Sequence, residues 1–274
     1  MLIDMVTAMI IFAVLAALFV LSQMGRTSHK GIAALRGWRY AHRGLHGNGI
    51  PENSMEAFRL ALEGGYGIEL DIHLMKDGNL AVIHDASLKR TAGADVLIED
   101  LNTDDLAKYP LEGTEEIIPT FRQVLELYAG KAPLIIELKA ERGNHAALTE
   151  AACKAMEGYD GPWCMESFDP RCVLWLKKNR PEVIRGQLTE NFLGNPQSKL
   201  PWILKLVLSW QLENFLIRPD FVAYKFADRK NVSIWLCKHL WKLQCVGWTL
   251  KSQAEQAQAD AEGWISIFEG YIPE

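Results

Sequence analysis

Short apolar runs recur along the chain from residue 39 onward, and amphipathic stretches of helical period separate most of them. Each run has the length of a buried β-strand, and each spacer is long enough for a helix. The runs cover residues 39–42, 67–73, 133–138, 163–167, 183–188, 220–224, 245–249 and 264–268. Eight strands that alternate with helices predict an α/β fold, namely a TIM-type (β/α)8 barrel.

A ninth apolar run, residues 80–83, follows the second predicted strand through Lys76-Asp77-Gly78-Asn79. Asp-Gly favours a tight turn, so this run predicts a small hairpin insertion after the second strand rather than another wall strand. After the last strand only residues 270–274 remain, which leaves no closing eighth helix. We expect residues 28–35 to be a candidate for covering that gap.

Several helices have recognisable first residues. Asn53 is expected to cap a helix that runs to about Glu63, with Glu56 completing a capping box. The pair Pro119-Thr120 opens another helix. The pair Asp169-Pro170 caps a third, because proline suits the first helical position.

The amino terminus carries the longest apolar stretch, residues 5–21, in which Thr7 is the polar exception. Extended weakly to Met24, it reaches the roughly 20 residues that cross a bilayer as a helix. A buried core helix is disfavoured because every face is apolar. A cleaved signal peptide is disfavoured because Asp4 is the only charged side chain before the run. The sequence therefore predicts an uncleaved single-pass anchor in the cell membrane.

Basic residues follow this stretch, at Arg26, Lys30, Arg36 and Arg39. By the positive-inside rule they predict that the rest of the chain lies in the cytoplasm. The expected organisation is an anchor at residues 1–26, a juxtamembrane linker at 27–37 and a barrel domain at 38–274.

Composition narrows the class of protein further. The chain has 274 residues, 49% of them hydrophobic, and a net charge of −5, which excludes a disordered chain and gives no attraction for nucleic acid. The five cysteines are odd in number and lack the spacing of zinc ligands. They predict buried free thiols in a reducing compartment. No protein partner is predicted.

Carboxylates stand at the ends of two predicted strands. Glu69 and Asp71 are two positions apart and share a face of the second strand, and Glu137 ends the third. Because functional groups of such barrels lie where strands end, these three should meet at the mouth. Three facing carboxylates need a cation between them, and oxygen ligands select Mg²⁺ or Ca²⁺. An exposed strand edge or a plain ion pair of Glu137 with Lys139 is the alternative.

Two histidines stand at the ends of predicted strands: His42 closes the first strand and His84 ends the hairpin. Such a pair suits acid-base catalysis near neutral pH, although a lone histidine at a strand end is more often structural. Arg43 and Lys139 add fixed positive charge that suits a phosphate.

Residues 40–91 contain, in order, the motifs HRG, PEN followed by a serine, ExD, KDG and HD with a nearby Leu and Arg. In this order and spacing the motifs resemble the signature of the bacterial glycerophosphodiester phosphodiesterases. The later segments IIPTFRQVLEL, PLIIELK, MESFDP and VGWT follow the family pattern as well, so the resemblance covers about residues 38–273.

This resemblance implies hydrolysis of glycerophosphodiesters to sn-glycerol 3-phosphate and an alcohol, with one divalent cation, Mg²⁺ or Ca²⁺. It implies an acid-base pair, His42 and His84, and three metal ligands, Glu69, Asp71 and Glu137. It implies substrate and phosphate contacts from Arg43, Lys139, Glu52, Asn53 and Trp248. One departure stands out: the family usually ends its last strand with Thr-Asp, whereas this chain has Phe268-Glu269.

A second apolar region, residues 200–217, is interrupted by Lys205, Gln211 and Glu213. It is either a helix packed on the barrel wall or an amphipathic helix in the membrane surface, with Trp202 and Trp210 at headgroup level. The second possibility would favour lysophospholipids as substrates and a lysophospholipase D activity. An inactive membrane-tethered barrel that binds lipid or acts as a scaffold is the alternative of another class.

Overall fold

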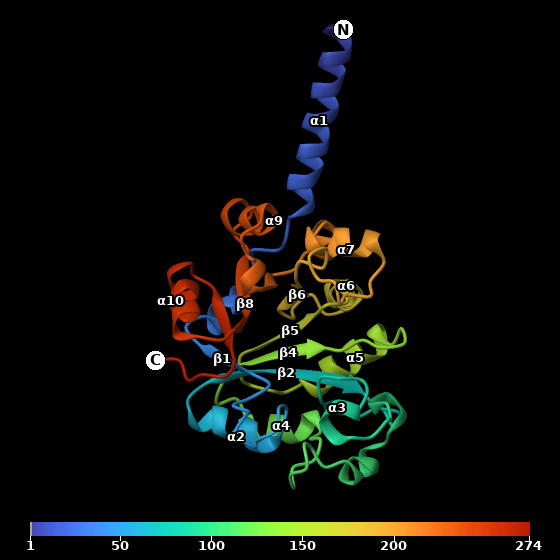
Figure 1. Ribbon diagram of the computed structural model, residues 1–274, viewed down its shortest axis with the longest axis vertical. Helices are drawn as coiled ribbons and strands as arrows, with labels where there is room; N and C mark the ends of the chain where they lie inside the picture. The colour runs from blue at the N-terminus through green and yellow to red at the C-terminus, as the bar shows by residue number, and fades with distance from the viewer. Residues whose placement is uncertain (1) are drawn as a thin grey trace.

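Eight parallel strands close into a barrel in the computed structural model, which describes residues 2–274 with side chains from Asp4 onward (Figure 1). The sheet order is β1-β9-β8-β7-β6-β5-β4-β2-β3, and pairing of β1 with β2 closes the ring. The wall strands are β1 (Arg39–His42), β2 (Gly67–Leu74), β4 (Leu134–Leu138), β5 (Trp163–Ser167), β6 (Arg185–Thr189), β7 (Phe221–Lys225), β8 (Gln244–Leu250) and β9 (Ile265–Phe268). The predicted TIM-type barrel is confirmed.

The extra strand β3 (Leu80–Val82) pairs antiparallel with β2, which confirms the predicted hairpin. The chain then makes an excursion before α4, with the short elements α3 (Lys89–Ala92), η2 (Ile98–Asp100) and η3 (Thr103–Lys108). A small apolar cluster of its own, which includes Ile83, Leu88, Ile98 and Leu106, holds this excursion together beside the barrel mouth.

Helices cover the outside of the barrel: α2 (Met55–Glu63), α4 (Phe121–Tyr128), α5 (His145–Ala155), α6 (Pro170–Asn179), α7 (Trp202–Ser209), α8 (Asn214–Ile217), α9 (Val232–Trp235) and α10 (Gln253–Ala261), with η4 (Phe226–Asp228) and the π-helical η5 (Leu236–Leu240). The main core lies between these helices and the sheet, where side chains such as Phe58, Phe121, Tyr128 and Leu148 are fully buried. Inward-facing side chains fill the barrel itself.

The expected cap of α2 is wrong by one residue. Ser54, not Asn53, is the N-cap, and its hydroxyl accepts a hydrogen bond from the Ala57 amide. Asn53 is buried and points to the barrel interior instead, where its amide bonds to a carboxylate of β2. The expected caps Thr120 of α4 and Asp169 of α6 both accept a hydrogen bond from their helix and are confirmed.

The suggestion that residues 28–35 cover the missing eighth helix is also wrong. The segment η1 (Lys30–Leu35) closes the amino-terminal end of the barrel: Leu35 is buried among Tyr40, Ile184 and Phe221, at or just before the start of the strands. The Tyr40 hydroxyl donates to the Leu35 carbonyl oxygen at 2.9 Å. Tyr66 and Tyr271 pack edge-on against Phe268 instead, so the carboxyl-terminal segment covers that side of β9.

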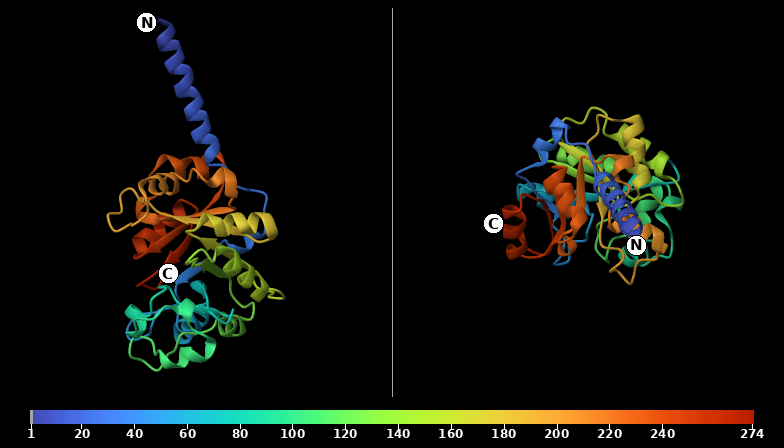
Figure 2. Two further views of the ribbon diagram at one scale, coloured as in Figure 1. Left: turned by 90° about the vertical axis from the view of Figure 1, so that its right-hand side faces the viewer. Right: turned by 90° about the horizontal axis from the view of Figure 1, so that it is seen from above.

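Helix α1 (Leu2–Ser22) stands away from the barrel (Figure 2). Within the described residues it is the one helix long and apolar enough to cross a membrane, over Asp4–Ser22, and no part of that stretch is buried. Its end is nevertheless built into the fold. Gln23 is fully buried and donates to the Trp210 carbonyl oxygen at 2.9 Å, and the Trp241 indole donates to the Val20 carbonyl oxygen at 2.9 Å.

Candidate active site

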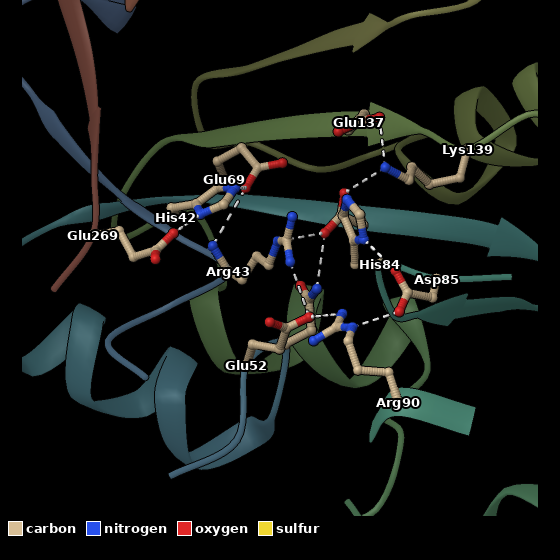
Figure 3. Close-up of polar contacts among 12 residues, drawn as sticks. His42, Arg43, Glu52, Glu69, His84, Asp85, Arg90, Glu137, Lys139 and Glu269 are labelled. Atoms are coloured by element: carbon tan, nitrogen blue, oxygen red, sulfur yellow. Dashed lines mark hydrogen bonds and ion pairs between the residues drawn. The ribbon is translucent and has the colours of Figure 1, made fainter. Parts of the chain in front are cut away.

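The charged residues singled out in the sequence converge at the carboxyl ends of the strands (Figure 3). His42 ends β1 beside Glu69 of β2, and Asp71 of β2 lies in register with Glu137 of β4. These side chains point inward because alternate residues of each strand face the barrel interior. The strand register therefore brings residues far apart in the sequence to one spot.

The three carboxylates form a tight, buried group. Glu69, Asp71 and Glu137 are at most 6% exposed, and each offers an oxygen within 4.8 Å of the others. Burial and repulsion from Asp71 raise the pKa of Glu69 well above its usual range, and burial raises the pKa of Glu137 to about 7. Burial acts in the same direction on Asp71, but Lys139, His84 and Arg43 together hold its pKa well below the usual range.

Two cations partly neutralise the group. The Lys139 ammonium lies 2.9 Å from Glu137 Oε1 and 3.4 Å from Asp71 Oδ1. The guanidinium Nε of Arg43 lies 3.4 Å from Asp71 Oδ2, and the Arg43 amide lies 3.3 Å from Glu69 Oε2. Two cations against three carboxylates do not balance the charge of the group when all three are ionised. Burial first, and the neighbouring carboxylates second, therefore raise the pKa values of Glu69 and Glu137.

The donor set fits a hard divalent cation. All three groups are carboxylates, which Mg²⁺ and Ca²⁺ prefer, and no soft sulfur or additional imidazole belongs to this cluster in the described residues. Asp71 Oδ1 is buried without a hydrogen-bond partner and so has a lone pair free for an ion. A bound cation would supply the charge that the carboxylate group lacks.

Each histidine is held by a carboxylate at the same ring nitrogen. Glu269 Oε2 lies 2.5 Å from His42 Nδ1, and Asp85 Oδ1 lies 2.6 Å from His84 Nδ1. The carboxylates make Nδ1 the protonated nitrogen, which leaves Nε2 as a base. Burial lowers the pKa of His42, and burial lowers the pKa of His84 to about 4, so both rings are neutral at pH 7.

An ion-pair network ties the phosphate-side cation to one histidine. Arg43 donates to Glu52 Oε1 at 3.0 Å, and the same oxygen accepts from Arg90 at 2.6 Å. Arg90 also donates to Asp85 at 2.5 Å, and Asp85 holds His84. Glu52 therefore orients Arg43 and Arg90 through charge-assisted hydrogen bonds.

Asn53 has a similar supporting place. Its amide donates to Asp71 Oδ2 at 2.9 Å from a backbone in the left-handed region, at φ 54°. Arg43 has a comparable backbone conformation, at φ 55°. Non-glycine residues hold this conformation at a cost, and such positions cluster at functional sites.

The cavity between these groups is small, about 50 Å³, and is lined by two kinds of side chain. The charged or titratable ones are His42, Arg43, Glu69, His84, Glu137 and Glu166, and the apolar ones are Phe168, Leu188, Trp248 and Ile267. Phe168 packs edge-on against Trp248 at 5.6 Å and against Phe192 at 5.9 Å. The cavity therefore combines carboxylates, two histidines and the Arg43 cation with an aromatic wall of Phe168 and Trp248.

All ten predicted site residues lie in this one region. Six of them line the cavity, namely His42, Arg43, Glu69, His84, Glu137 and Trp248, and Asp71, Lys139, Glu52 and Asn53 contact members of that set. The distances place Glu52 and Asn53 on other protein side chains, so their roles as direct substrate contacts stay predictions.

Several residues of the site were missed by the sequence reasoning. Glu166 of β5 lies in register with Glu137, is 1% exposed, lines the cavity and leaves Oε2 without a hydrogen-bond partner. Burial and the Glu137 charge raise its pKa well above the usual range. Its place in the strand MES, beside Glu137 of the neighbouring strand, was the available signal. Phe168 and the pairing of Arg90 with Asp85 were missed as well.

Comparisons with known proteins give the family to which this chain is similar. Residues 42–263 match the model of the glycerophosphoryl diester phosphodiesterase family. A glycerophosphodiester phosphodiesterase of Caldanaerobacter subterraneus subsp. tengcongensis is 34% identical over 166 residues, which cover 57% of this chain and 68% of that protein. The lysophospholipase D GDPD1 of Rattus norvegicus is 33% identical over 132 residues, 43% of this chain and 40% of that protein.

Solved structures provide a comparison of the fold. The structure of an Oleispira antarctica phosphodiesterase in complex with the product sn-glycerol-3-phosphate superposes with a TM-score of 0.72 at 22% identity. The superposition covers 86% of this chain and 93% of that one, so the shared architecture extends over almost the whole barrel.

Proposed function

The chain belongs to the glycerophosphoryl diester phosphodiesterase family, and we propose that it hydrolyses glycerophosphodiesters to sn-glycerol 3-phosphate and an alcohol with the aid of one divalent cation. The observation that supports this proposal is the buried group of Glu69, Asp71 and Glu137 between two histidines whose Nδ1 atoms are both held by carboxylates. The chemistry is phosphodiester hydrolysis by paired acid-base groups.

The three carboxylates would hold Mg²⁺ or Ca²⁺. When bound, such a cation neutralises charge that builds up on the phosphoryl oxygens. Arg43 and Lys139 stand on the same side and bind the phosphodiester, with Glu52 fixing the direction of the Arg43 fork. The bound cation would offset both the repulsion among the three carboxylates and the negative charge that the phosphodiester brings to the site.

The histidines move protons at Nε2. One neutral imidazole removes a proton from the nucleophile, which is either a hydroxyl of the substrate's own glycerol or a water molecule. The other, protonated once the anionic substrate is bound, donates a proton to the leaving alkoxide. An attacking hydroxyl on the substrate is already close to phosphorus, which lowers the entropic part of the barrel enzyme's activation barrier.

An assay against a panel of diesters tests this function. The purified chain is incubated with glycerophosphodiesters of different headgroups, with Mg²⁺ and Ca²⁺ in turn and with EDTA. We expect release of sn-glycerol 3-phosphate that requires the cation. Absence of turnover on every diester would contradict the proposal and favour the inactive lipid-binding barrel.

Lysophospholipids are a second candidate substrate class. The observation that favours them is a row of three aromatic rings: Trp248 and Phe168 line the cavity, and Phe192, in the loop before α7, packs against Phe168. The rat relative's name gives the same activity for that protein. Turnover of a lysophospholipid and of the matching deacylated diester, compared by kcat/KM, separates the two classes.

We also propose that α1 is an uncleaved single-pass anchor in the cell membrane. The contacts at the carboxyl-terminal end of α1 support this. Gln23 hydrogen-bonds to Trp210, Trp241 hydrogen-bonds to Val20, and Phe19 packs against Trp210. Cleavage near residue 23 would remove those contacts. The expected division into residues 1–26, 27–37 and 38–274 stays a prediction, although residues 30–35 contribute to the barrel through the buried Leu35.

The cytoplasmic side is proposed for the barrel. The five cysteines are all free and buried, as a reducing compartment allows. Of the basic residues after the anchor, Arg26 is paired with Asp220 at 2.5 Å and Arg39 with Asp260 at 3.1 Å, which leaves Lys30 and Arg36 to favour the inner face. Because native thiols are buried, a cysteine introduced at exposed Glu141 reports the side: labelling of intact cells by an impermeant reagent would place the barrel outside.

A further inference from the structure

The exposed large apolar side chains of the body gather in one part of the fold. Outside α1, most of those that the structure describes lie on α7, α8 and the adjoining α9 and η5. This set, called the collar here, comprises Trp202, Ile203, Leu204, Leu206, Phe215, Leu216, Val232, Trp235 and Leu240. Soluble monomers rarely expose so many apolar side chains together, and such surfaces mark contact with a protein or a membrane.

The collar surrounds the point where α1 leaves the body. In Figure 1, α7 and α9 stand on either side of the lower end of α1, and Figure 2 shows the same region directly below the helix. Phe19 of α1 packs edge-on against Trp210 at 5.9 Å. A groove of about 650 Å³ runs between Leu15 and Leu18 of α1 and Phe215 of α8, with Arg218 at its rim.

Helix α7 shows how the collar departs from an ordinary barrel helix. Its inner side is anchored by Leu208, whose carbonyl oxygen accepts a hydrogen bond from Thr189 at 2.8 Å. Its outer side carries exposed Trp202, Ile203 and Leu206, and Lys205 is the only charged residue in the helix. A surface helix of a soluble barrel has a polar outer face. The outer face of α7 is apolar, so we expect an apolar medium against it in addition to the barrel on its inner side.

Helix α2 of the same barrel provides the comparison. Its outer face carries Arg59, which forms ion pairs with Glu56 and Glu63 one turn to either side. That face is charged and suited to contact with water. The apolar outer face of α7 is therefore linked to the position of this helix beside α1. It is not a general property of the helices of this chain.

We propose that the collar lies in the boundary between headgroups and acyl chains of the leaflet that α1 enters. This rests on the proposed anchor, because the medium around α1 also reaches the side chains at its base. A protein partner would have to cover the collar and the emerging helix together. Trp202 and Trp235 are the side chains that prefer this depth of a bilayer.

The charge around the collar fits an anionic lipid surface. Although the whole chain has a net charge of −5, the segment from residue 199 to 242 is basic. Two of its basic residues, Lys225 and Arg229, pair with Glu190 and Glu262 outside the segment. The segment carries six further basic residues, Lys199, Lys205, Arg218, Lys230, Lys238 and Lys242, against Glu213, Asp220 and Asp228. Of these acids, Glu213 and Asp220 are buried, and basic groups next to a membrane segment attract anionic headgroups.

Contact through the collar fixes how the barrel meets the membrane. In Figure 1, β2 and β4 run across the direction of α1, so the barrel lies on its side below the helix. Its mouth then opens along the membrane surface and not away from it. Phe192, in the loop that leads to α7, joins the collar side to the aromatic wall through Phe168.

Spin labels on the full-length chain test the proposal in vesicles of phosphatidylcholine and phosphatidylglycerol. Because the native cysteines are buried, single cysteines take the label. Ile203→Cys and Trp235→Cys report the collar, Leu15→Cys reports α1, and Glu126→Cys on exposed α4 is the aqueous control. Collision rates with oxygen, which dissolves in lipid, and with a water-soluble nickel chelate give the depth of each label.

We expect both collar labels to collide less with nickel and more with oxygen than the Glu126 label does, approaching the Leu15 label. Nickel collisions at both collar positions equal to those at Glu126, with the Leu15 label still protected, would overturn the collar while leaving the anchor intact. Full nickel access at Leu15 as well would overturn both. Neither result depends on whether the site hydrolyses diesters.

Discussion

At the residue scale, His42 and His84 are alike in one respect: a carboxylate holds Nδ1 of each ring and leaves Nε2 available. We expect His42→Ala and His84→Ala each to lower kcat by about 10²- to 10⁴-fold, the usual contribution of one acid-base group. Both side chains lie at the barrel mouth, so the thermal unfolding midpoint should change little. Near-native turnover in either variant would refute the paired role.

Glu269 tests whether the hydrogen bond to His42 matters. The His42 hydrogen bond holds the pKa of Glu269 near 2, so a full negative charge faces the ring. Glu269→Gln removes that charge, and we expect kcat to fall by about 10- to 100-fold, as for other groups that orient a functional histidine. Since Glu269 raises the pKa of His42, the acid limb of the pH–rate profile should move to lower pH.

The matched control for this variant is Lys251→Met. Lys251 is an exposed ion-pair partner of Glu269, at 3.4 Å, and does not touch the cavity. Unchanged kcat for the lysine variant and loss for the glutamine variant would assign the effect to the His42 contact. Equal losses in the two variants would contradict it.

Relative to the wild type, we expect Glu69→Gln to be more stable without a cation and less stable with saturating cation. Without a cation, Glu69→Gln removes a buried carboxyl group whose ionisation is opposed by burial and by the charges of Asp71 and Glu137. We therefore expect the unfolding midpoint near neutral pH to rise by about 2 to 4 °C, equivalent to roughly 1 kcal/mol. With saturating cation the wild-type chain should gain about 3 kcal/mol and the variant little. Glu126→Gln, on the exposed face of α4, is the control. Equal cation stabilisation of all three chains would contradict the metal assignment.

Much of the site could be predicted because its residues sit in contiguous motifs. HRG, ExD and HD each place two functional side chains within three positions. Glu166 was missed because its role comes from pairing with Glu137 across the sheet. The carboxylate of Glu269 was noted only as a departure, since its 2.5 Å contact with His42 depends on closure of β9 onto β1.

At the scale of elements, the strands followed directly from the apolar runs because a parallel barrel buries both faces of its wall. The cap of α2 did not, since Asn53 and Ser54 are both good caps and only the barrel interior decides between them. The place of residues 28–35 depended on tertiary packing of one leucine, Leu35, which no local pattern reveals.

Glu213, in the turn before α8, should make the stability of the chain depend on pH. Glu213 is buried, neither of its carboxylate oxygens has a hydrogen-bond partner, and burial raises its pKa to about 8. A raised pKa means that the folded state holds the proton more tightly than the unfolded state does. The stability that this group contributes is therefore present below about pH 4.5 and is lost as the pH rises to about 8.

Glu213→Gln should remove this loss. We expect the wild-type chain and the variant to have similar stability at pH 5 and the variant to be more stable at pH 8.5, by an amount on the order of a few kcal/mol. Denaturant unfolding in detergent at the two pH values measures the difference. Parallel pH dependences in the two chains would show that Glu213 is not buried as a protonated acid.

At the scale of the whole molecule, one chain combines an apolar helix long enough to cross a membrane, an apolar collar and a barrel whose site has both charged groups and an aromatic wall. Sequence periodicity predicted the barrel and the apolar helix separately. It did not predict that the end of α1 is built into the body, because that depends on contacts of Gln23 with Trp210 and of Trp241 with Val20. Those contacts fix the end of α1 to the barrel.

The central claim is that Glu69, Asp71 and Glu137 hold the cation that the two histidines need for diester hydrolysis. Its most direct test is the initial rate of sn-glycerol 3-phosphate release from a glycerophosphodiester, measured on chelator-stripped full-length chain as Mg²⁺ or Ca²⁺ is added, for the wild type and Asp71→Asn. The account predicts no rate without cation, a saturable rise in the wild type and at most a trace in the variant. A wild-type rate that is the same in EDTA as in saturating cation, or an unaltered titration in Asp71→Asn, would contradict it.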